Sequence, residues 1–196
     1  MIFNDDESYP LIEVFAGIGR HHLSLSFYSA DYDGDVVLSK DIPFDGELYR
    51  ANERVVSSLE YDNYDFIYRY DVIDLENFLV GGSIGLVARL LVFDGYVSID
   101  STTLRSEEDF NLPLPMVGVN FHVGLLKDII EARVLLTGIS YSGDMALDGL
   151  AEISVTPFSF LDVHGGYRFF KIDVEEDDVT FDFENSGLFV ALTVSF

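Results

Sequence analysis

The sequence predicts an all-β chain, an antiparallel up-and-down β-barrel that spans a membrane with its strands. The stretch 187–196 alternates between aliphatic and small or polar residues, and successive side chains of a strand point to opposite faces. The chain is 48% hydrophobic although 23% of its residues are charged, as expected if charge lies in connections and apolar residues lie in strands. The best helical candidate, 78–93, contains Arg89 and is shorter than the about 20 apolar residues that a spanning helix needs.

The last strand carries the most specific pattern. Its apolar row is Leu188, Val190, Leu192, Val194 and Phe196. The stretch resembles the closing strand of small Gram-negative outer-membrane β-barrel proteins, which ends in a C-terminal Phe. This resemblance implies an outer-membrane location, contact with outer-membrane lipid and lipopolysaccharide, and recognition of the last strand by the barrel-assembly machinery. We predict that the five residues of the row face lipid.

Period-two alternation predicts nine strands. In chain order they are 11–18, 22–30, 55–72, 79–99, 116–126, 129–141, 147–157, 161–174 and 179–196. Their apolar rows begin, in the same order, with Ile12, Leu23, Tyr64, Ile84, Val117, Ile130, Ala151, Val163 and Leu188. In the last strand the parity flips across 185–187, which predicts a bulge or a stretch that stands clear of the membrane.

Short connections alternate with longer acidic ones along the chain. The short ones are Gly19-Arg20, 74–77, Lys127-Asp128 and 158–160, and the acidic runs are 31–35, 107–109 and 175–178. This alternation is typical of periplasmic turns and extracellular loops. Counting back from the last strand makes the first strand run toward the periplasm, so we expect a ten-stranded fold that lacks its first strand. Alternatively, nine strands close imperfectly, or the connection 36–53 holds an extra hairpin.

The faces opposite the apolar rows collect charged residues of both signs. They are Glu13, Asp65, Glu131 and Glu152 with Arg69, Arg89, Arg133 and Arg168. Charges on a lipid face cost several kcal/mol near the midplane, so these eight residues are predicted to point into the lumen and to form ion pairs. The lumen is then either filled by a structural salt-bridge ladder or left as a narrow polar channel.

Composition limits the partners and the chemistry. The net charge of −24 argues against nucleic acid, and the absence of cysteine excludes disulfides, thiolate metal sites and a cysteine nucleophile. The acidic runs are solvated connections or sites for Ca²⁺ or Mg²⁺, although none has EF-hand spacing. No cofactor is predicted, and metal ligands cannot be assigned. Residues 1–8 lack the features of a secretory signal, so we expect a mature or shortened sequence that forms one domain over 1–196.

We expect a structural barrel or a narrow passive channel rather than an enzyme. The alternatives are an outer-membrane hydrolase acting on lipid A or peptides, and cation binding or adhesion through the loops. A group of His22, Ser24, Ser26 and Glu13 could be drawn as a catalytic site, but all four histidines, at 21, 22, 122 and 164, lie beside short turns. A soluble lipocalin-like barrel is the architectural rival, and it would need an apolar interior.

Overall fold

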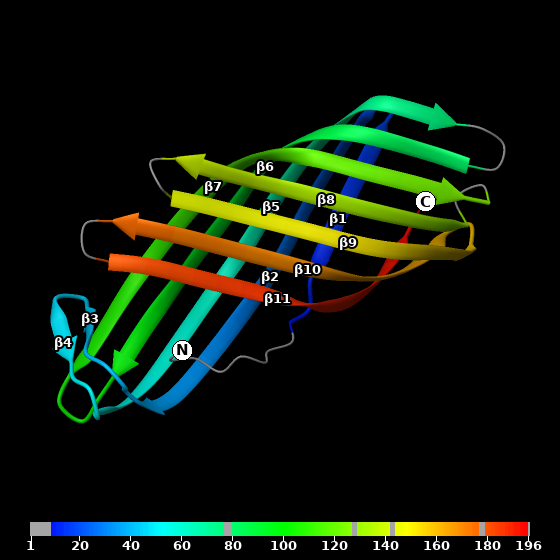
Figure 1. The fold of residues 1–196 in the computed structure, drawn as a ribbon. Coiled ribbons are helices and arrows are strands. Elements are labelled where there is room, and N and C mark those ends of the chain that lie inside the picture. Colours follow the sequence, from blue (N-terminus) through cyan, green and yellow to red (C-terminus); the bar gives the residue numbers. More distant parts are fainter. Residues whose placement is uncertain (1–8, 77–79, 127–128, 142–143, 177–178, 196) are drawn as a thin grey trace. The chain divides into compact units, whose positions relative to one another are not determined.

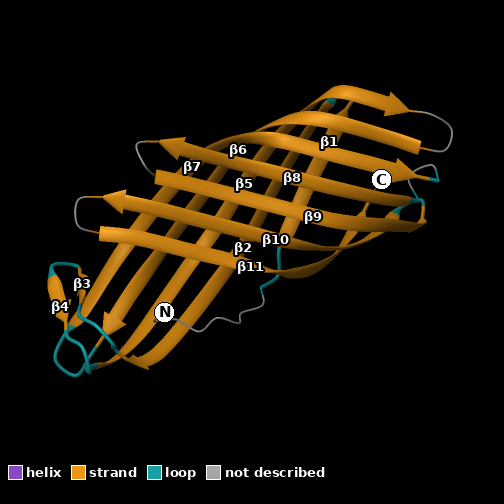
Figure 2. Cartoon of the chain, in the orientation of Figure 1, coloured by secondary structure: helices purple, strands orange, loops and turns teal. Residues whose placement is uncertain are grey.

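The computed structural model describes residues 9–76, 80–126, 129–141, 144–176 and 179–195. These residues form strands, turns and connections, and no helix occurs among them (Figure 2). The all-β class predicted from the alternation of side chains is therefore confirmed. Within the described ranges, no helix has the length and apolar character that crossing a membrane requires.

Nine strands form one antiparallel sheet in the order β1-β2-β5-β6-β7-β8-β9-β10-β11, and β3 and β4 form a separate two-stranded sheet (Figure 1). The strands are β1 (Ile12–Ile18), β2 (His21–Val37), β3 (Ile42–Phe44), β4 (Glu47–Tyr49), β5 (Arg54–Glu76), β6 (Val80–Asp100), β7 (Arg105–Leu125), β8 (Ile130–Tyr141), β9 (Asp144–Phe158), β10 (Leu161–Glu176) and β11 (Val179–Val194). Neighbouring strands in this order pair with each other, as expected for an up-and-down topology, and β1 and β11 are the two end strands.

Each of the nine predicted segments overlaps one strand of the large sheet, but two strands are much longer than predicted. β2 extends to Val37 and β7 begins at Arg105. The acidic runs 31–35 and 107–109 therefore lie within strands, as does 175–176, and not in the predicted connections. Backbone pairing continues through these residues although they lack the apolar alternation that marks the rest of each strand.

The extra hairpin considered for 36–53 is present as β3 and β4, where Pro43 pairs with Leu48. The bulge expected at 185–187 is absent, because the β10–β11 register runs without a shift from Leu161↔Val194 to Glu176↔Val179. Glu184 and Ser186 consequently lie on the same face as Leu188. The apolar residues change from one face to the other across 185–187, but the strand itself stays regular.

The chain divides into two compact units, each built from separate segments. Unit 1 comprises 1–14, 25–66 and 91–113, and unit 2 comprises 15–24, 67–90 and 114–196. Strands β1, β2, β5, β6 and β7 contribute residues to both units, whereas β8 to β11 belong to unit 2 alone. Each unit is described by itself below. The single domain predicted for 1–196 stays a prediction.

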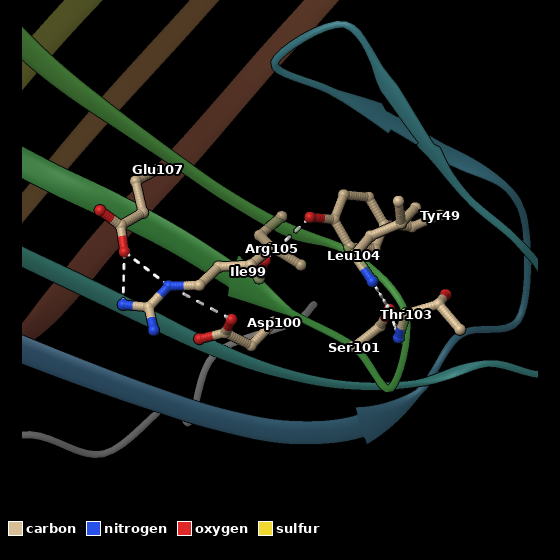
Figure 3. Close-up of polar contacts among 8 residues, drawn as sticks. All are labelled: Tyr49, Ile99, Asp100, Ser101, Thr103, Leu104, Arg105 and Glu107. Atoms are coloured by element: carbon tan, nitrogen blue, oxygen red, sulfur yellow. Dashed lines mark hydrogen bonds and ion pairs between the residues drawn. The ribbon is translucent and has the colours of Figure 1, made fainter.

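Unit 1 contains a small hydrophobic cluster beneath the β3–β4 hairpin. Its buried members are Leu38, Tyr49, Val55 and Ile99. The hairpin turns at Asp45 and Gly46, which have φ values of 48° and 75°, as a two-residue hairpin turn requires. The Tyr49 side chain is fully buried, and its hydroxyl donates a hydrogen bond to the Ile99 carbonyl at 2.8 Å (Figure 3). The connection 36–53 therefore packs an apolar core of its own.

The β6–β7 turn beside this cluster is also ordered by polar contacts. The Ser101 hydroxyl accepts hydrogen bonds from the backbone N–H groups of Thr103 and Leu104, at 3.3 and 3.0 Å (Figure 3). The Arg105 guanidinium lies between the carboxylates of Asp100 and Glu107. These contacts hold the turn against the residues that bury Tyr49.

Tyr49→Phe is expected to lower the free energy of unfolding by about 1–3 kcal/mol, because it leaves the buried Ile99 carbonyl without its donor. Urea unfolding of the purified protein measures the change. Tyr64→Phe is the control, because the Tyr64 side chain is exposed, and a change within about 0.5 kcal/mol is expected. Equal effects of the two variants would contradict the assigned role of the Tyr49 hydroxyl.

A second prediction concerns an exposed ion pair of unit 1. Arg54 donates hydrogen bonds to Asp35 from Nε at 2.8 Å and from Nη2 at 2.6 Å, and these bonds lower the pKa of Asp35 below its ordinary value of 3.8. Because the folded-state pKa is depressed, the pair persists above the ordinary value and is lost as the pH falls through the folded-state pKa. Carboxyl NMR titration is expected to return this pKa to about 3.8 in Arg54→Gln. A native pKa at or above 3.8 would contradict the pairing.

Candidate functional site

The register of β7 to β11 in unit 2 aligns their apolar residues into rows across the sheet. One row contains Phe121, Val134, Ala151, Tyr167 and Leu188. The next row contains Val123, Ala132, Ile153, Gly165 and Val190. Because side chains alternate along a strand, these rows share one face of the sheet. We call this surface the aliphatic face.

The aliphatic face is exposed, and it ends where the first charged residues appear on the same face. Leu188 is 87% exposed and Val190 is 82% exposed. On β10 and β11, the first charged residues on this face are Lys171 and Glu184. The β10 segment between the turn and this boundary, 161–169, spans about 30 Å at the usual rise per residue. Tilted by about 35–45°, such a strand matches an apolar band roughly 25 Å tall.

The opposite face of unit 2 holds a buried ion network centred on Asp148 of β9. Arg89 Nη1 lies 2.7 Å from Asp148 Oδ1, and Arg168 Nη2 lies 2.9 Å from Asp148 Oδ2. The side chains of Arg89 and Asp148 are 1% and 0% exposed. Arg89 also donates to the Thr137 hydroxyl at 3.0 Å. The network therefore joins β6, β8, β9 and β10 through charged groups removed from water.

A second ion group lies four residues further along β9 on the same face. Arg133 and Glu152 are direct cross-strand partners of β8 and β9, and Arg133 Nε lies 2.8 Å from Glu152 Oε1. His164 Nδ1 of β10 lies 3.8 Å from the same oxygen. Cross-strand neighbours have Cβ atoms about 5 Å apart, so the register itself brings the two charges together.

A third group involves Asp71 of β5. His22 Nε2 lies 3.0 Å from Asp71 Oδ2, and Arg69 Nε lies 3.4 Å from Asp71 Oδ1. Gly85 of β6 provides the space for this carboxylate, since a Cβ there would lie 2.7 Å from Asp71 Oδ1. Any larger residue at position 85 would displace the carboxylate that pairs with His22 and Arg69.

The same face contains a buried amide. Asn120 of β7 is fully buried, and neither its side-chain oxygen nor its nitrogen has a hydrogen-bond partner among the described residues. Buried polar groups in folded proteins are nearly always satisfied, often by ordered water. We therefore expect bound water beside Asn120.

The eight residues predicted to form lumenal ion pairs have different environments in the structure. Arg133 pairs with Glu152, and both belong to the eight. Arg89 and Arg168 share Asp148, Arg69 pairs with Asp71, and Glu131 lies 3.3 Å from His122, so these partners lie outside the eight. Asp65 is buried in unit 1, and Glu13 is exposed on β1. The central acid of the Asp148 network was not predicted. Asp148 lies four residues before Glu152 on β9, so the alternation of side chains places both on the same face. The sequence pattern could therefore have identified it.

The predicted lipid-facing row lies on the aliphatic face. Leu188, Val190, Leu192 and Val194 are all exposed side chains of β11. Phe196 lies outside the described residues.

Two members of the catalytic grouping drawn from the sequence have defined surroundings in the structure. His22 contacts Asp71, whereas Glu13 is exposed on β1. Among the described residues, no group of three or more His, Cys, Asp or Glu side chains is placed to hold a metal ion. The charged residues of the polar face pair acids with bases, an arrangement suited to filling an interior.

Comparison of the chain with protein-family models, with curated proteins and with solved structures finds no match.

Proposed function

We propose that the chain is an integral outer-membrane β-barrel protein with a structural role, its interior filled by ion pairs. The observation that carries the proposal is the opposition of two faces within unit 2. The side chains of Leu188 and Val190 are exposed, whereas those of Arg89 and Asp148 are fully buried. A soluble barrel has the reverse arrangement, with an apolar interior and a charged exterior.

Water is a poor solvent for the aliphatic face. Soluble monomers rarely expose contiguous apolar patches larger than a few hundred Å². The exposed apolar rows of unit 2 continue across five hydrogen-bonded strands, β7 to β11. On β10, the residues from Leu161 to Phe169 that share the aliphatic face are all uncharged. Hydrocarbon accepts such a surface without cost, so a bilayer is the solvent that fits it.

The strand order supports a barrel with one further strand. In an antiparallel sheet of nine strands, the first and the last strand run in the same direction. β1 and β11 therefore both run toward the end of the sheet that carries the short β1–β2 turn. Bacterial single-chain barrels have an even number of antiparallel strands. Open sheet edges do not occur in hydrocarbon, because each unpaired backbone group costs several kcal/mol. A tenth strand, antiparallel to both, satisfies these requirements.

The ion network favours a structural barrel over an open channel. Asp148 and Arg89 are removed from water, Arg168 also contacts Asp148, and Thr137 also contacts Arg89. An aqueous pore would leave these side chains hydrated. In this proposal the short-turn end faces the periplasm, and the acidic strand ends face the lipopolysaccharide of the outer leaflet. The closing strand β11 is the segment that the barrel-assembly machinery would recognise.

Reconstitution tests the proposal. The refolded protein is expected to float with lipid vesicles, to migrate differently in gels before and after heating, and to add no current beyond leak to a planar bilayer. Recovery of unheated protein in the lipid-free fraction would contradict the membrane assignment. Steady ion conductance would favour the narrow channel, and hydrolysis of lipid A or of peptides would favour the enzyme alternative.

A further inference from the structure

An apolar groove lies on unit 2 at the end that carries the short β1–β2 turn. It has a volume of about 340 Å³ and is lined by Ala16, Gly17, Ile18, His21, Leu23 and Tyr68. Ile18 is 82% exposed, and Leu23 is also an exposed side chain. The groove therefore opens outward, toward the solvent that surrounds the aliphatic rows, and not toward the buried ion pairs.

Aromatic and polar groups form the rim of this groove. His21 Nδ1 and the Tyr68 hydroxyl are 2.8 Å apart, and the His21 ring lies 5.0 Å from the Tyr70 ring, measured between centroids. These contacts hold the imidazole in place although His21 is exposed. Amphipathic rings of this kind gather where a membrane protein meets the headgroup layer.

Arg20 supplies a charge that no carboxylate of the described residues neutralises. It lies in the turn between the groove residues Ile18 and His21, and it is exposed. Arg69, Arg89, Arg133 and Arg168 of the same unit each face a carboxylate within 4 Å. Among the described residues, Arg20 forms no such ion pair. It is therefore a free cation beside an apolar groove, in a chain whose net charge is −24.

We propose that this groove binds an anionic glycerophospholipid, with an acyl chain along Ile18 and Leu23 and the headgroup phosphate on Arg20. Guanidinium groups match the geometry of phosphate oxygens, and His21 and Tyr68 lie within the same rim to contact the headgroup. The proposal rests on the proposed function, whose orientation brings the short-turn end into the periplasmic leaflet.

Tryptophan quenching by brominated lipids tests the proposal, since the natural chain contains no tryptophan. Tyr70→Trp places a single reporter beside His21, and Val72→Trp, at an exposed position on the same face of β5, is a second reporter in case the first perturbs folding. The protein is reconstituted into vesicles containing brominated phosphatidylglycerol or brominated phosphatidylcholine. One arginine at a membrane surface supports a preference of about fivefold for the anionic lipid. Arg20→Gln is expected to reduce this ratio to about one.

Arg54→Gln is the matched control, because it removes the same charge from unit 1 and is expected to keep the fivefold preference. A ratio near one in the reporter protein, or a fivefold ratio that survives Arg20→Gln, would overturn the lipid site. Flotation of the same samples separates this failure from failure of the proposed function. Protein that floats without lipid preference contradicts the groove alone, whereas protein that does not float contradicts both.

Discussion

Val190→Arg is expected to prevent stable insertion of the protein into lipid vesicles. Val190 lies in the middle of the exposed apolar row of β11, between Leu188 and Leu192. An arginine on the lipid face near the bilayer midplane costs about 2–4 kcal/mol. The floated fraction of refolded protein, compared with that of the native sequence, measures the effect. Leu192→Arg, two residues along the same row, is expected to act similarly.

Ala191→Ser provides the matched control for this row. Ala191 is the neighbour of Val190 in β11 and pairs with His164 of β10, so it belongs to the opposite face. A hydroxyl on the polar face is expected to leave flotation unchanged. If Val190→Arg gave protein that floats and shifts on heating like the native chain, the assignment of the aliphatic face to lipid would be wrong.

Asp148→Ala is expected to destabilise the protein by about 3–5 kcal/mol. The substitution removes the carboxylate that lies 2.7 Å from Arg89 Nη1, and it deprives a guanidinium whose side chain is 1% exposed of this counterion. An uncompensated buried charge carries a cost of this size. Arg168, which is partly exposed, loses the same partner but can turn toward water. The midpoint of urea unfolding in lipid or detergent measures the loss.

Removing both charges separates the cost of an orphaned arginine from the cost of a lost residue. Arg89→Met with Asp148→Leu is expected to recover most of the stability, since apolar replacements of a buried pair are often neutral or stabilising. Asp35→Ala, which breaks the exposed pair with Arg54, is expected to shift the midpoint little. An Asp148→Ala protein that unfolds at the native midpoint would show that the network does not support the fold.

The strands and their faces could be predicted from sequence because the two faces of each strand have different surroundings, and side chains alternate between them. The exposed Ile84, Leu86 and Leu90 and the buried Ser83, Val87 and Arg89 of β6 follow from alternation alone. The ends of β2 and β7 could not be predicted in this way. In these extensions acids such as Asp31, Asp33 and Glu107 take the exposed positions, so backbone pairing continues while the exposed apolar row that marks it disappears.

Pairing partners were harder to predict than faces, because partners depend on register between strands. Arg133 and Glu152 meet since β8 and β9 align them directly. The assignment of Arg89 to Asp148 joins β6 to β9 across two intervening strands, which no pattern within either strand indicates. The burial of Tyr49 was missed for a related reason, since its hairpin lies in a polar connection and packs against Ile99, fifty residues away.

A spin-label scan of β11 tests the central claim most directly, and the absence of cysteine makes single-cysteine variants straightforward. Labels are placed one at a time at positions 188 to 194 in vesicle-reconstituted protein. Dissolved oxygen concentrates in hydrocarbon, whereas a nickel chelate stays in water. Oxygen accessibility is expected to peak at 188, 190, 192 and 194, with the intervening positions low. Strong nickel accessibility at 188, 190 and 192 would place the aliphatic face in water and contradict the account.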